Sequence, residues 1–127
     1  MKIGKALITK DDFMQIKRGN IVLVNLDPVI GSEQGKTRPA LVIQNDIGNE
    51  YSPTVIIAPI TTKLFSKLFP TNVEIDDKNS SLKYKSTILL NQIRTIDKSR
   101  ILKNYGSISN RKMKEVDDAI KNSLGLV

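Results

Sequence analysis

Arginine, lysine, carboxylate and hydroxyl side chains must carry any chemistry in this chain, because its 127 residues include no histidine and no cysteine. These absences exclude disulfides, thiolate catalysis and cysteine-ligated zinc. They also remove the commonest general base and the commonest metal ligand. Whatever chemistry this chain performs, it performs without either residue type.

The charge of the chain is uneven along its length. Its net charge is +7, from 20 basic and 13 acidic residues. Residues 1–60 carry seven basic and six acidic residues, whereas residues 61–127 carry thirteen and seven. An anionic partner would therefore be attracted mainly to the second half. Charge alone also fits a lysine-rich protein that is merely soluble, and that is the commoner case.

Three β-branched runs in the first half predict strands. They are Asn20 to Asp27, Pro39 to Asn45 and Thr54 to Ile60, and Pro59 should mark the edge or the end of the third. Residues 29–37 between the first two runs predict a flexible polar loop, with glycines at positions 31 and 35. Residues 46–53 predict a turn-rich connection.

The second half predicts shorter elements. Residues 63–69 can form a helical turn or a loop, Asn72 to Ile75 alternate as a strand, and Ser86 to Ile96 form a longer apolar and then alternating stretch. A C-terminal helix is the clearest element, since Ser109 is a good N-cap and Gly125 supplies the stop. Its apolar positions recur at spacings of three and four and predict core packing: Met113, Val116, Ile120 and Leu124.

These elements predict one domain over residues 1–127, of mainly β class with α (α+β). Five or six short strands and one helix, without a β/α alternation, indicate a small antiparallel barrel with a C-terminal helix. Residues 1–16 form an N-terminal extension, within which residues 9–16 could be a short helix. No signal peptide and no stretch of ~20 apolar residues is present, so we expect a soluble cytoplasmic protein without a membrane segment.

One long series of motifs resembles the MazF/PemK toxin family, especially its Gram-positive branch. It begins with RGNIVLVNLDPVIGSEQGKTRPALVIQNDIGN at residues 18–49 and continues through SPTVIIAPIT, PTNVEID and STILLNQIRTIDKSRI. It ends in KMKEVDDAIKNSLGL, so that the resemblance covers residues 17–126 in order and at family spacing. The fold that it implies is the small SH3-like barrel that this family shares with the CcdB toxins.

The resemblance assigns roles to eight residues. Arg38, in the sequence TRPA, matches the catalytic arginine, and Thr61 matches the catalytic threonine. The remaining six match residues that bind RNA, in the first loop and on a later strand: Ser32, Glu33, Gln34, Gly35, Gln92 and Arg94. Since a guanidinium stays protonated, Arg38 suits charge stabilisation and proton donation to the leaving oxygen, and the base for the 2′-hydroxyl is left open.

The resemblance implies the toxin of a type II toxin–antitoxin system: a metal-independent, cofactor-free, sequence-selective endoribonuclease. It would cleave single-stranded mRNA at U-A-C-A-U-type sites by attack of the 2′-hydroxyl, leaving 2′,3′-cyclic phosphate and 5′-hydroxyl ends. The expected partners are RNA, a second copy in a homodimer, and a MazE-like antitoxin with an acidic disordered C-terminal segment. The alternative is a CcdB-like gyrase poison of the same fold, although this chain lacks the tryptophan characteristic of those proteins.

Without the resemblance, each site residue has an ordinary structural explanation. Arg38 could pair with Glu33 or a nearby aspartate, and Thr61 could be a plain strand terminus. Residues 32–35 could be a polar turn, and residues 92–94 a solvated strand face. Two positions also depart from the family pattern. Asn20 stands where an aspartate is usual, and Pro59 stands where a small residue is usual, which could shift the Thr61 loop.

Overall fold

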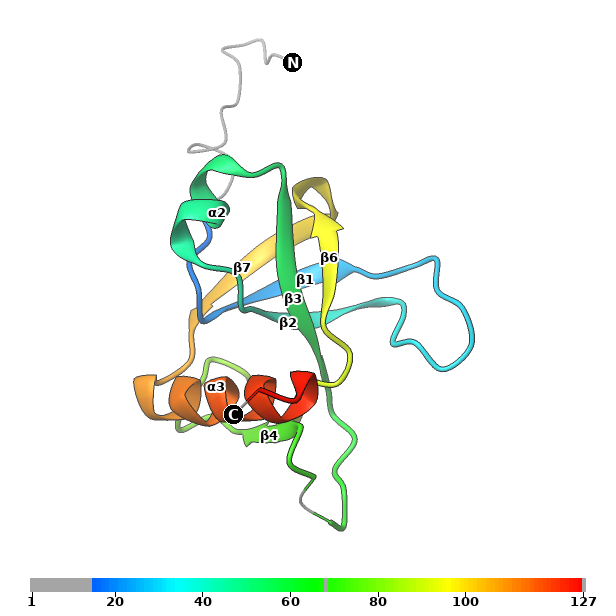
Figure 1. Cartoon of the computed structure of the whole chain (residues 1–127), viewed down its shortest axis with the longest axis vertical. Coiled ribbons are helices and arrows are strands. Elements are labelled where there is room, and N and C mark those ends of the chain that lie inside the picture. The colour runs from blue at the N-terminus through cyan, green and yellow to red at the C-terminus, as the bar shows by residue number, and fades with distance from the viewer. Residues whose placement is uncertain (1–14, 68, 127) are drawn as a thin grey trace, which may run out of the picture.

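The structure of the chain is a computed structural model that describes residues 15–67 and 69–126. The expected short helix over residues 9–16 lies almost wholly outside them. Figure 1 shows a bent sheet, with a short helix at its upper end and the C-terminal helix across its lower end. The strands and helices are β1 (Asn20–Asn25), β2 (Thr37–Val42), α2 (Asp46–Tyr51), β3 (Thr54–Thr61), β4 (Asn72–Ile75), β5 (Ser86–Leu89), β6 (Arg94–Asp97), the 3₁₀ helix η1 (Lys98–Arg100), β7 (Ile101–Ser107) and α3 (Asn110–Leu124).

The sheet is antiparallel at every pairing. Its strand order is β4-β5-β3-β2-β1-β7, and β6 pairs with the first half of β3. No pairing within the described residues closes this path, so the sheet is barrel-like but open. The fold class predicted from the sequence, mainly β with a C-terminal helix, is therefore confirmed.

The two faces of the sheet bury different sets of residues, because successive side chains of a strand point in opposite directions. Along β2, Leu41 belongs to the cluster that α3 covers, whereas Ala40 and Val42 belong to the cluster on the other face. Along β3, Ala58 belongs to the cluster that α3 covers, and Ile57 belongs to the cluster on the other face. Each face thus has its own apolar core, and the strands between them are held on both sides.

Helix α3 begins and ends as its capping residues predict. The Ser109 hydroxyl accepts a hydrogen bond from the Lys112 backbone N–H at 3.2 Å, and Gly125 closes the helix in the left-handed conformation at φ 70°. Val116 and Ala119 are its buried residues, and Met113 and Ile120 pack against the same cluster while partly buried. Leu124 is 60% exposed, so the predicted core packing of this residue is wrong. An ion pair of 2.6 Å between Arg18 and Asp117 joins the helix to the chain just before β1.

The connection over residues 46–53 is not a plain turn, because its first part forms the helix α2. The Asn45 side chain caps this helix by accepting a hydrogen bond from the Gly48 N–H at 2.8 Å. Asn49 is buried, and its amide bonds to the Gln44 carbonyl at 2.9 Å. The pKa of Asp46 lies below its usual value because the Arg18 backbone N–H, and then the Asn49 side chain, donate hydrogen bonds to its carboxylate.

Three other predictions need correction. The stretch of residues 86–96 is two strands, β5 and β6, separated by a turn over residues 90–93. Strand β7 was not predicted, and it raises the number of strands in the described residues to seven. Pro59 does not end its strand, since it pairs with Ala40 inside β3, which continues to Thr61. Pro59 is tolerated because it lies between the part of β3 that pairs with β6 and the part that pairs with β5.

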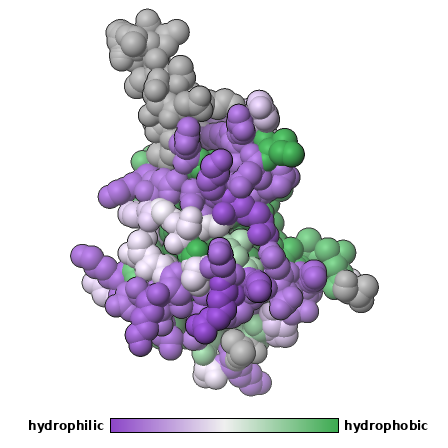
Figure 2. Space-filling view, turned by 90° about the vertical axis from the view of Figure 1, so that its left-hand side faces the viewer, coloured by the Kyte–Doolittle hydropathy of each residue, from purple (hydrophilic) through white to green (hydrophobic). Residues whose placement is uncertain are grey.

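The surface on the side of α2 and β7 is mainly hydrophilic, as Figure 2 shows.

Residues 63–69 were predicted to form either a helical turn or a loop. The described residues of this segment form a loop. Across all the described residues of the chain, no helix combines the length and the apolar character needed to cross a membrane.

Candidate functional site

The first loop, residues 26–36 between β1 and β2, projects from one side of the sheet (Figure 1). Its two ends are joined by a hydrogen bond of 2.9 Å from the Leu26 N–H to the Lys36 carbonyl. Asp27 strengthens this junction, since its carboxylate accepts from the Lys36 N–H at 2.7 Å. Arg94, at the start of β6, donates to the Leu26 carbonyl at 3.0 Å. The base of the loop is thus held in place.

Gly35 has a packing role in this loop. A Cβ built at Gly35 would lie 2.6 Å from Asp27 Oδ1 and 2.8 Å from Val29 Cγ2, closer than real Cβ contacts allow. The two ends of the loop approach each other at this point, and only a glycine fits without displacing the side chains of Asp27 and Val29. The structure therefore gives Gly35 a reason to be glycine that does not depend on any ligand.

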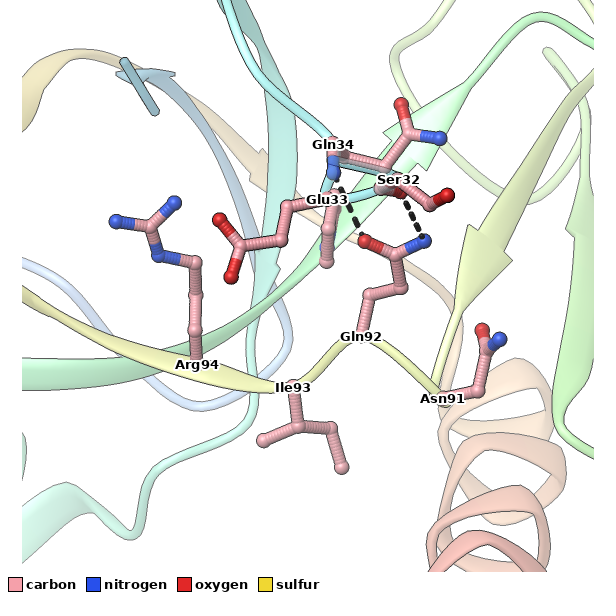
Figure 3. Close-up of a pocket in the computed structure, with 8 residues that line it drawn as sticks. Ser32, Glu33, Gln34, Asn91, Gln92, Ile93 and Arg94 are labelled. Atoms are coloured by element: carbon pink, nitrogen blue, oxygen red, sulfur yellow. Dashed lines mark hydrogen bonds between the residues drawn. The ribbon is translucent and has the colours of Figure 1, made fainter. Parts of the chain in front are cut away.

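Gln92 holds the tip of the first loop from the turn between β5 and β6. Its Oε1 accepts a hydrogen bond from the Gln34 N–H at 2.9 Å, and its Nε2 donates to the Ser32 carbonyl at 3.5 Å. Figure 3 shows the Gln92 amide facing the loop backbone, with Ile93 pointing away. The sequence placed Gln92 on a strand, but the turn is what lets it reach across.

These contacts enclose a hollow of about 540 Å³. It lies between the first loop, the middle of β3 and the turn before β6. Pro59, Asn91 and Ile93 line it. So do five of the six residues assigned to RNA binding: Ser32, Glu33, Gln34, Gln92 and Arg94. The structure thus brings together residues that are about 60 positions apart in the sequence.

Replacing Gln92 by leucine should loosen the first loop. The variant keeps the apolar part of the side chain and loses both hydrogen bonds to the loop backbone. Since one such bond contributes about 1 kcal/mol, exchange of the Gln34 amide hydrogen should become roughly five- to tenfold faster. Hydrogen exchange followed by NMR measures this directly, with the exposed Thr95→Ala on β6 as control. Equal exchange in wild type and Gln92→Leu would contradict the role of Gln92.

Arg38 is half-buried near the start of β2. Its Nε donates to the Gly35 carbonyl at 2.8 Å, which fixes the side chain against the base of the first loop. Within the described residues no carboxylate lies within ion-pair distance of Arg38, so the structural ion pair considered above is not formed. Glu33 has another role, since its Oε1 accepts from the Ile30 N–H at 2.8 Å. The terminal nitrogens of Arg38 make no hydrogen bond and no ion pair to the described part of the chain.

The register of β2 and β3 relates Arg38 to Thr61. Val42 pairs with Ile57 and Ala40 with Pro59, so continuing this ladder would set Arg38 opposite Thr61. The pairing between β2 and β3 ends at Ala40, because the end of β3 pairs with β5 whereas the start of β2 pairs with β1. Arg38 and Thr61 therefore stand on either side of the point where the two strands part.

Thr61 lines a second hollow, of about 320 Å³, which shares Gln34, Asn91 and Gln92 with the first. Its Oγ1 accepts a hydrogen bond from the Lys63 N–H at 3.2 Å, which leaves the hydroxyl hydrogen free to donate. Arg38 lines neither hollow. The sequence did not single out Asn91, Lys63, Phe65 and Phe69, which also line these hollows. The cation and the aromatic rings within residues 63–69 were a signal in the sequence that could have found Lys63, Phe65 and Phe69.

Comparison with known proteins identifies the family. Residues 17–124 match the family described as PemK-like, MazF-like toxin of type II toxin–antitoxin system. The chain belongs to this family. The matched residues contain all eight predicted site residues and leave out the whole N-terminal extension, residues 1–16.

Individual members of the family agree with this assignment. The chain is 51% identical over 111 residues to a protein named endoribonuclease MazF from Staphylococcus saprophyticus, covering 87% of this chain and 92% of that protein. A crystal structure of MazF from Deinococcus radiodurans superposes with a TM-score of 0.76 at 25% identity, covering 89% of this chain and 99% of that one. A mycobacterial endoribonuclease in complex with its cognate antitoxin has the same fold, with a TM-score of 0.73 at 20% identity and coverage of 88% and 97%.

Proposed function

We propose that this chain is the endoribonuclease toxin of a type II toxin–antitoxin pair and that it cleaves single-stranded mRNA at selected sequences. The observation that carries the proposal is the register that sets Arg38 and Thr61 on either side of the point where β2 and β3 part, with Thr61 lining one of two hollows that share three residues. The 51% identity to a protein named endoribonuclease MazF supports the same activity.

Arg38 and Thr61 suit cleavage in which the RNA supplies its own nucleophile. The 2′-oxygen attacks the adjacent phosphorus and loses its proton, the bond from phosphorus to the 5′-oxygen breaks, and that oxygen gains a proton. The products are a 2′,3′-cyclic phosphate and a 5′-hydroxyl. Arg38 presents a planar fork of donors to the phosphate oxygens and protonates the leaving oxygen. The Thr61 hydroxyl adds one donor, and both groups act where negative charge grows.

The two hollows suit the reading of unpaired bases. Gln92 and Gln34 line both of them, and Ser32, Glu33 and Arg94 line the first. Amide, hydroxyl and charged groups can hydrogen-bond the edges of bases that have been splayed from a single strand. We propose a preference for U-A-C-A-U-type sites, and resistance of stable duplexes.

The proposed partners follow from charge and from the family. A solved mycobacterial relative of the same fold is bound to its cognate antitoxin. For this chain we propose a MazE-like antitoxin whose acidic, disordered C-terminal segment occupies the RNA site, attracted by the net charge of +7. We also propose that the protein acts as a homodimer in the cytoplasm, where mRNA is found.

Cleavage of a long natural RNA in the presence of a chelator tests this function. We expect undiminished cutting in EDTA, because an arginine, a hydroxyl and the substrate's own nucleophile require no metal. Sequencing of the cut ends should give 5′-hydroxyls and cyclic phosphates at U-A-C-A-U-type sites. A complete requirement for magnesium would contradict the mechanism, and intact RNA under all conditions would contradict the function.

A further inference from the structure

The segment that joins β3 to β4 carries an aromatic pair that the proposed chemistry does not use. The ring centroids of Phe65 and Phe69 lie 5.8 Å apart, with an angle of 89° between the planes. Lys63 Nζ lies 5.1 Å from the centroid of the Phe65 ring. The whole chain has only three phenylalanines and no tryptophan. Two of the three phenylalanines lie in this one segment.

These two rings do not serve the hydrophobic core. Neither belongs to the two buried clusters nor to the apolar residues packed against them. Phe65 is half-buried, and Phe69 is 45% exposed. Both line the 320 Å³ hollow that contains Thr61. Large apolar rings kept at the wall of a surface hollow that also has polar lining residues are typical of a binding surface.

Hydrogen bonds fix this segment beside Thr61. At its start, the Lys63 N–H donates to Thr61 Oγ1 at 3.2 Å, and the Lys63 carbonyl accepts from the Thr87 hydroxyl at 3.1 Å. At its end, the Asn72 N–H donates to the Phe69 carbonyl at 3.0 Å. The rings are therefore anchored from both sides within the hollow that Thr61 lines.

The same hollow offers polar groups for the edge of a flat ligand. Asn72 and Asn91 line it, and their side-chain amides make no hydrogen bond to the described part of the chain. Each amide can both donate and accept. Aromatic faces, a neighbouring cation and free amides together match a base, its phosphate and its hydrogen-bonding edge.

We propose that Phe65 and Phe69 form a base-stacking subsite for the nucleotide next to the scissile phosphate, with Lys63 contacting a phosphate and Asn72 and Asn91 facing the base edge. This inference rests on the proposed function, because it takes RNA as the ligand. Every base has a π face, so the stacking should add affinity with little choice among bases. Any selectivity at this nucleotide then comes from the two amides.

Fluorescence of 2-aminopurine tests the stacking directly. The probe is an oligonucleotide with a U-A-C-A-U-type site, a 2′-deoxy residue at the cut to prevent cleavage, and 2-aminopurine placed on one or the other side of the cut. With wild type we expect quenching at one of the two positions on binding. With F65A/F69A we expect that quenching to be lost and the Kd to rise roughly 5- to 100-fold.

Matched variants separate stacking from loop structure. Leu64→Ala changes an exposed residue of the same segment that does not line the hollow, and it should bind and quench as wild type does. Phe69→Trp should keep the quenching, whereas Phe69→Leu should weaken it although the apolar bulk remains. Circular dichroism checks that each variant is folded. If F65A/F69A does not fold, the comparison of Phe69→Trp with Phe69→Leu tests the stacking.

The outcomes distinguish the subsite from the function. If wild type cleaves RNA and the phenylalanine variants still bind and quench as it does, the subsite is overturned and the proposed function stands. If wild type leaves RNA intact, the proposed function fails, and the binding measurement still decides the subsite. Quenching at neither position in wild type overturns the subsite in either case.

Discussion

Arg38→Ala is expected to lower kcat for RNA cleavage about 10²- to 10³-fold and to leave the protein folded. The loss of one preorganised donor at a developing negative charge costs about this much, or roughly 3–4 kcal/mol of transition-state stabilisation. The half-buried Arg38 is aimed by a single hydrogen bond from its Nε to Gly35, so its removal disturbs little of the core. Single-turnover cleavage of a fluorogenic oligonucleotide measures the effect, and thermal unfolding checks the fold.

Two variants control this experiment. Arg38→Lys keeps the charge but loses the planar fork, so it should recover only part of the rate. Arg111→Ala removes an exposed arginine of α3 and should cleave at the wild-type rate. If Arg38→Ala cleaves as fast as Arg111→Ala, Arg38 has no part in the chemistry.

Thr61→Val is expected to lower kcat about 10²-fold, since valine has nearly the shape of threonine but no hydroxyl to donate to the phosphate. The hydroxyl is held in position because it accepts from the Lys63 N–H at 3.2 Å. Thr61→Ser should keep most of the rate because it keeps this group. The same single-turnover assay compares the two.

Thr62→Val is the matched control for Thr61. Thr62 is the next residue, is exposed and lines neither hollow, so its loss of a hydroxyl should leave kcat unchanged. A full rate for Thr61→Val would remove Thr61 from the site. A loss with Thr61→Ser as large as with Thr61→Val would mean that the shape of the side chain matters and that its hydroxyl does not.

The proposed site draws on four separate segments of the chain. Side chains of the first loop, the end of β3 and the turn before β6 line the two hollows, whereas Arg38 at the start of β2 lines neither. Gln92 joins two of these segments by its hydrogen bonds to the first loop. An antitoxin segment that displaced the first loop would therefore have to break these bonds, which links inhibition to loop order.

Local patterns predicted the elements whose ends are set by their own residues. Ser109 and Gly125 delimit α3 because a cap satisfies backbone groups within one turn. The alternation of Asn72 to Ile75 predicted β4 with its correct bounds, since one face of that strand is buried. No neighbour from a distant part of the chain was needed for either prediction.

The incorrect predictions concern elements whose structure depends on residues far away in the sequence. Strand β7 buries little of itself and has a weak pattern, but it forms because it pairs with β1. Helix α2 includes Gly48 and would be a poor helix alone, and the buried contact of Asn49 with Gln44 favours it. Pro59 suggested a strand end, and only the change of partner along β3 shows why the strand can continue.

The sequence by itself determined which residue types are available and which family pattern they follow. It excluded histidine and cysteine chemistry, and it singled out Arg38 and Thr61 by motif. Only the tertiary structure decided how these two residues stand relative to each other. The register that relates Arg38 to Thr61 and the hydrogen bond between Gln34 and Gln92, 58 positions apart, depend on how β2, β3 and β5 diverge. Residue periodicity describes one segment at a time, whereas a site of this kind exists only between segments.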